Sequence, residues 1–233
     1  MIALLLHPAA QLSWSNFTVH PSTAIGIAAV GAAYLWRVRQ GPSAIDRVPV
    51  TVPDLAQATS AQREAAAAPQ GPTLAQRVSF LTSLLLLFFT LNGPLHDLSD
   101  YYLFSGHMVQ HLILLFPVPI LLLQAGPVTL LLRVASPRWR ARILAVLQSR
   151  AVGVISHPLV GWTLLVAVMW GTHLSIMFDA ALQDQFIHYL EHALYLSIAL
   201  LFWAPIFSVD PIRHRLRGAS ALVYLITQMP QNS

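Results

Sequence analysis

Five apolar stretches, each close to the length needed to cross a bilayer, constrain this chain to a helical membrane bundle. They cover about 21–36, 78–95, 101–124, 158–178 and 188–207. A bilayer core needs roughly 20 apolar residues in a helix, and a helix satisfies its own backbone hydrogen bonds there. A further apolar segment at 219–229 is only about half that length. We therefore predict an all-α polytopic transmembrane helix bundle with about five full spans and a partial C-terminal apolar segment.

The basic residues predict the orientation of the bundle. All 13 are arginine and lie in the blocks 37–77, 133–150 and 213–217. The other inter-span turns contain no arginine and hold Asp97, Asp100, Asp179 and Asp184. Because cytoplasmic loops carry the excess of basic residues, the arginine blocks are expected inside and the acidic turns and N-terminus outside.

This pattern divides the chain into three segments. Residues 1–39 form an outer N-terminus and the first span, and residues 78–233 form the membrane bundle. The segment 40–77 between them is rich in Ala, Pro, Gln and Ser, a composition that cannot bury a core, so it is expected to be a flexible cytoplasmic loop.

Composition excludes several classes of protein. Hydrophobic residues make up 56% of the chain and charged residues 9%, with a mean hydropathy of +0.62, which differs strongly from soluble proteins. The pI near 10.0 reflects arginines that flank spans, so nucleic-acid binding is not expected. With no cysteine, disulfides and thiolate metal sites are excluded, and His, Met and carboxylate remain as metal ligands.

Histidines placed in the apolar stretches are the strongest functional signal. The set expected to bind metal near the outer side is His107, His111, His173, His188 and His192. Two pairs have a separation of four residues, which puts both imidazoles of each pair on one helical face. Ionisable side chains at membrane depth are costly and usually mark a functional site.

The donor types favour copper. Imidazole suits copper, zinc, iron or nickel, and methionines near the histidines shift the preference toward Cu(I). Two alternatives stay open. One is a membrane haem protein or oxidoreductase subunit with bis-histidine ligation. The other is a membrane metallopeptidase, because His188, Glu191 and His192 match the H-x-x-E-H pattern. In the copper interpretation Glu191 orients a ligating histidine.

The remaining histidines carry a weaker signal. His7, His20 and His96 fall in the outer regions, where single exposed histidines are usually solvated, although such residues could capture a metal on its way in. His157 and His214 fall at the cytoplasmic ends of apolar stretches and are expected to lie at the membrane interface.

The sequence 102–111 (YLFSGHMVQH), followed by Pro117 and Pro119, resembles the CtaG family of integral-membrane cytochrome c oxidase assembly factors. Trp170 to His173 and the pair His188 and His192 extend the likeness, which covers about 78–229. The resemblance implies a non-enzymatic, multi-pass protein of the bacterial inner membrane that works with cytochrome c oxidase subunits. It also implies a copper role for the five histidines of the set above.

The topology can be tested with reporter fusions at residues 60 and 100, one in the loop 40–77 and one in an acidic turn. We expect the two positions to report opposite sides of the membrane, because an arginine block and an arginine-free turn lie on different sides. Alkaline phosphatase and green fluorescent protein fusions measure this. The same side at both positions would refute the assignment.

Overall fold

A computed structural model describes residues 19–39, 72–93, 95–96, 104–210 and 214–228 of this chain, and all regular elements in them are helices. Most of the predicted loop 40–77 and most of the outer N-terminus, with His7, lie outside these residues. The first half of the described bundle comprises α1 (Pro21–Arg39), α3 (Leu74–Leu91), α5 (Phe104–Leu115), α6 (Pro117–Ala125) and α7 (Pro127–Val134). The second half comprises α8 (Pro137–Leu147), α9 (Arg150–Ile155), α10 (Pro158–Thr172), α11 (Ser175–Gln183), α12 (Gln185–Phe207) and α13 (Ala219–Ile226).

The prediction of about five full spans is not confirmed. In the described part of the chain, three helical segments are long and apolar enough to cross a membrane: Leu74–Leu91, Ser105–Leu132 and Gln185–Phe207. The stretch expected at 158–178 is broken into α10 and α11, which meet at 77°, and counts as a fourth crossing only if this bent pair is one span. The first stretch forms a shorter apolar helix, Pro21–Trp36.

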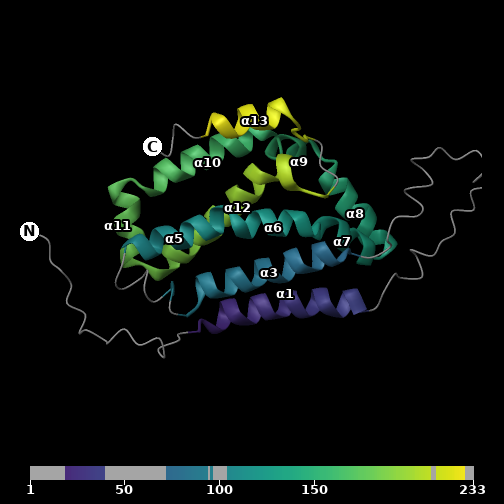
Figure 1. Cartoon of the computed structure of the whole chain (residues 1–233), viewed down its shortest axis with the longest axis horizontal. Helices are drawn as coiled ribbons and strands as arrows, with labels where there is room; N and C mark the ends of the chain where they lie inside the picture. The colour runs from purple at the N-terminus through teal and green to yellow at the C-terminus, as the bar shows by residue number, and fades with distance from the viewer. Residues whose placement is uncertain (1–18, 40–71, 94, 97–103, 211–213, 229–233) are drawn as a thin grey trace, which may run out of the picture.

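The helices are ordered across the bundle so that α12 lies near its centre. Helix α1 packs on α3, α3 on α5 and α6, and α12 packs on α5, α6, α10 and α11 (Figure 1). The start of α1, the end of α3 and the starts of α5 and α12 gather at one end, whereas α7, α8 and α9 lie at the other. Outward side chains such as Leu85, Leu112 and Leu190 are more than half exposed, as expected for a lipid-facing surface.

Two prolines interrupt the helix that carries the first histidine pair. Phe116 separates α5 from α6, with φ −118° and ψ −80°. Pro119 has no N–H to donate to the carbonyl four residues before it, that of Leu115. The Trp203 indole takes that place, since its Nε1 donates to the Leu115 oxygen at 2.7 Å. A side chain of α12 therefore supplies the hydrogen-bond donor for a backbone carbonyl of α5.

Helix α10 packs closely on α12 where Gly161 meets Leu201, one turn before Pro205 of α12. A Cβ at Gly161 would lie 2.9 Å from the Leu201 carbonyl oxygen, so only glycine permits this approach of the two backbones. The Tyr224 hydroxyl donates to the Phe202 carbonyl at 3.1 Å and joins α13 to the same region. Helix α12 is thus held on several sides.

Replacing Trp203 with Phe should destabilise the fold by about 1–3 kcal/mol, because it leaves the buried Leu115 carbonyl without a donor. Reversible unfolding in detergent measures the effect. Trp162→Phe is the matched control, since the Trp162 Nε1 is buried without a hydrogen-bond partner among the described residues. Equal losses of stability in both variants would show that the Leu115 hydrogen bond contributes nothing.

Candidate metal centre

Helix α5 contributes the first two side chains of the candidate centre. His107 and His111 are one turn apart, and their ring centroids lie 4.1 Å from one another. They are 6% and 4% exposed, so both imidazoles are inside the bundle. Between them Gln110 is fully buried, and its Nε2 donates to the Thr90 carbonyl on α3 at 2.6 Å. This bond turns the histidine face of α5 toward α12.

Helix α12 contributes a stripe of four polar side chains at helical spacing. His188, Glu191, His192 and Tyr195 are all buried, and separations of three and four residues put them on one face. The helix begins at a defined residue, because the Asp184 carboxylate caps it by accepting the backbone N–H of Phe186 at 2.8 Å. The first three turns of α12 therefore carry these four side chains.

The two histidine pairs face each other in register, because α5 and α12 both start at the same end of the bundle (Figure 1). Ring centroids are 5.2 Å apart for His107 and His188, and 5.4 Å apart for His111 and His192. Within α12, the Nε2 atoms of His188 and His192 are 3.2 Å apart. Four of the five histidines predicted from the sequence thus lie together.

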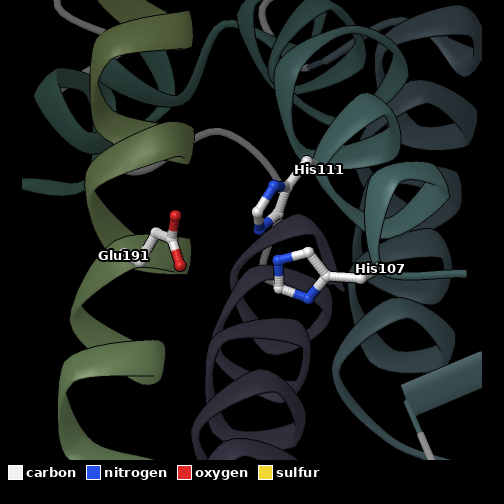
Figure 2. A group of neighbouring side chains, drawn as sticks. All are labelled: His107, His111 and Glu191. Carbon is white, nitrogen blue, oxygen red and sulfur yellow. The ribbon is translucent and has the colours of Figure 1, made fainter. Parts of the chain in front are cut away.

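One group of three side chains has the geometry of a metal centre. Potential ligand atoms of His107, His111 and Glu191 all lie within 4.8 Å of one another. Figure 2 shows the two rings of α5 turned toward the carboxylate on α12. Nitrogen and oxygen ligands bind metal ions at about 2 Å, so a single ion between these atoms needs only small side-chain movements.

Buried polar atoms in this cluster lack partners, which fits a bound cation. Among the described residues, no hydrogen bond is made by either ring nitrogen of His111, by Nδ1 of His192 or by Oε2 of Glu191. Burying a polar atom without a partner is costly, and burying a carboxylate more so. A cation held by these atoms would compensate the Glu191 charge and use the nitrogen lone pairs.

Tyr195 connects the cluster to α10. Its hydroxyl lies 2.6 Å from Thr172 Oγ1. Its ring is fully buried and packs edge-on against His111, with centroids 4.3 Å apart. This tyrosine is placed to hold the His111 imidazole in position, a role that the sequence analysis did not identify.

His173 is placed differently from the other four predicted ligands. It is exposed, it follows the last residue of α10, and its Nδ1 contacts the Met169 carbonyl at 2.6 Å. It is not in the group formed by His107, His111 and Glu191. Met177 lies beyond the bend, on α11, so Met169, His173 and Met177 do not share one helical face.

Two residues, Glu191 and His96, lie closer to the candidate centre than the sequence predicted. Glu191, expected to orient a ligating histidine, lies with the ligand atoms themselves; the H-x-x-E-H pattern was the signal for it. His96, expected to be solvated, is only 2% exposed, and its ring lies 6.3 Å from that of His188. No sequence pattern indicated this burial.

Comparison with known proteins identifies the family of this chain. The family model described as cytochrome c oxidase caa3 assembly factor (Caa3_CtaG) matches residues 55–233. Uncharacterized proteins of Mycobacterium bovis and Mycobacterium tuberculosis are each 29% identical over 160 residues, and one of Mycobacterium leprae is 28% identical. These matches cover 66% of this chain but 24% of each relative, so the chain spans about a quarter of their length. No solved structure matches.

Replacing His111 with Leu should stabilise the metal-free protein by about 1–3 kcal/mol, because it removes two buried nitrogens that have no partner. Unfolding in the presence of a chelator measures this. Gln110→Leu is the matched control on the same helix and should destabilise, since it breaks the bond to the Thr90 carbonyl. Destabilisation by His111→Leu equal to that by Gln110→Leu would contradict the interpretation.

Proposed function

This chain belongs to the family of cytochrome c oxidase caa3 assembly factors, and we propose that it binds copper between α5 and α12 and delivers it to the oxidase. The observation that carries the proposal is the buried group of His107, His111 and Glu191, with ligand atoms within 4.8 Å of one another. The proposed role is non-catalytic, because the copper ion is cargo that the protein passes to another protein.

The donor chemistry supports copper as the ion. Imidazoles of His188 and His192 adjoin the group on α12 and offer further nitrogens, and imidazole is among the ligands that suit copper. The chain contains no cysteine, so thiolates cannot hold the ion. A set of imidazoles with one carboxylate suits an ion that must be transferred rather than retained. His173, at the end of α10, is proposed as an accessory ligand.

The proposed setting is the inner membrane of a bacterium, with the N-terminus and the histidine end of the bundle outside. Supporting this orientation, the arginine-containing helices α8 and α9 lie at the end opposite the starts of α5 and α12 (Figure 1). The proposed partners are the lipid bilayer and the oxidase subunits that receive copper on the outer side.

A peptidase is the second candidate, favoured by the Nε2 atoms of His188 and His192, which lie 3.2 Å apart with Glu191 in the same turn. In that case the two histidines would hold zinc and Glu191 would activate water. Zinc-dependent proteolysis that Glu191→Gln abolishes, with zinc retained, would establish it. A haem protein would instead show an intense Soret band, which copper(I) bound to histidine does not produce.

The copper proposal is tested with the double variant His107→Ala and His111→Ala. We expect its affinity for Cu(I) to fall by roughly tenfold or more, since effects of that size follow even from loss of residues that only orient ligands. Competition with a coloured Cu(I) chelator and metal analysis of the detergent-purified protein measure this. The variant should still insert and fold, because Ala is well tolerated in helices.

The double variant His157→Ala and His214→Ala is the matched control, since these two rings are also paired, with centroids 4.9 Å apart, at the other end of α10. In cells that depend on the variant, oxidase activity should fall for the α5 variant and not for the control. Added copper should partly restore it. Unchanged copper affinity and full oxidase activity of the α5 variant at limiting copper would refute the proposal.

A further inference from the structure

A line of imidazole rings leads from the histidine end of the bundle to the candidate centre. His20 and His96 have ring centroids 4.7 Å apart, and His96 is followed by His188 at 6.3 Å and by His107 at a further 5.2 Å. These residues come from four different segments: the residue before α1, the turn after α3, α5 and α12. His20 is half-buried, whereas the rings that follow it along the line, from His96 to His111, are all at most 8% exposed.

We propose that His20 and His96 form a second copper-binding site, which accepts Cu(I) and transfers it to His188 at the buried centre. This inference rests on the proposed copper function of the α5–α12 centre. Two nitrogens bonded to one ion at about 2 Å each place their ring centres about 6 Å apart. The separations along the line are of this size, so neighbouring rings can share an ion while it moves.

A hydrogen bond joins the His20 ring to α12, since its Nδ1 lies 3.0 Å from the Tyr189 hydroxyl. Metal-binding histidines generally donate their other ring N–H to an acceptor, which fixes the tautomer. In the proposed copper-binding form, Nδ1 donates to the tyrosine oxygen and Nε2 of His20 keeps its lone pair for copper. Tyr189 has the role of a positioning residue in that form.

The backbone around the pair is anchored independently of the imidazoles. The His20 N–H donates to Asn92 Oδ1 at 2.8 Å, and Asn92 is fully buried at the end of α3. Gly93 follows with φ +82°, a conformation that favours glycine and turns the chain where α3 ends, three residues before His96. Replacing either imidazole with Ala leaves the His20–Asn92 bond intact, so such variants keep the fold.

Transfer along the line requires no change in the charge of the ion. At each step one copper–nitrogen bond forms to the next ring while one breaks behind it, so Cu(I) remains Cu(I). The two sites have distinct tasks: the outer pair sets how fast copper enters, and the buried centre sets how tightly it is held. Variants of the outer pair are therefore expected to change the rate of copper uptake, and variants of the buried centre its affinity for copper.

The test uses the full chain in detergent and Cu(I) supplied as its bicinchoninate complex, whose colour is lost as the protein takes up the ion. We expect His20→Ala with His96→Ala to slow uptake about tenfold, while the final affinity of the buried centre is unchanged. Tyr189→Phe should slow it less, because both imidazoles remain. The matched control His157→Ala with His214→Ala should take up copper at the wild-type rate.

Two results would overturn the inference: an unchanged rate of uptake in the His20 and His96 variant, or loss of the final affinity together with the rate. An unchanged rate would show that His20 and His96 have no role in copper entry. Loss of both affinity and rate would show that His96 is a ligand of the buried centre itself. Failure of the proposed copper function can be distinguished from failure of this inference. If the α5–α12 centre does not bind copper, His107→Ala with His111→Ala would leave the amount of bound copper unchanged, whereas the His20 and His96 variant would still lose an outer ion.

Discussion

The hydrogen bond from the Trp203 indole to the Leu115 carbonyl holds α12 against the helix that carries His107 and His111. It exists because Pro119 leaves that carbonyl without its usual donor, and an apolar interior offers no water in its place. Leu115 lies one turn after His111, so the contact acts next to the histidine face of α5. The register of the two histidine pairs, and with it the candidate centre, depends on this contact.

The interior of the bundle contains two kinds of polar side chain. Gln110 with Thr90, and Tyr195 with Thr172, form hydrogen bonds that connect neighbouring helices. The ring nitrogens of His111, by contrast, have no partner among the described residues, although they lie beside these satisfied groups. A buried group without a partner lowers stability, and proteins keep such groups mainly where function requires them. This contrast within one small region supports assigning the histidines to an ion rather than to the packing of the helices.

The bundle separates its charges along its length. Helices α7, α8 and α9, with half of the described arginines, lie at one end, and the starts of α5 and α12 lie at the other (Figure 1). The rings of His20, His96 and His188 extend from that second end into the interior. An assembly factor with this arrangement would take up copper on the side that the arginines avoid. The family match shows the assembly-factor membership, and the copper uptake is our proposal.

Helix periodicity determined from the sequence alone that the chain is all-α and that His107 pairs with His111 and His188 with His192. These features are local, because spacings of three and four residues share a face in any helix. Tertiary structure decided which faces meet. It brought Glu191 among the ligand atoms, buried His96 beside His188, and ended α10 at Thr172, which turned His173 outward and reduced the number of clear spans to three or four. Contacts between helices and the 77° bend depend on packing across the whole bundle, which no local spacing encodes.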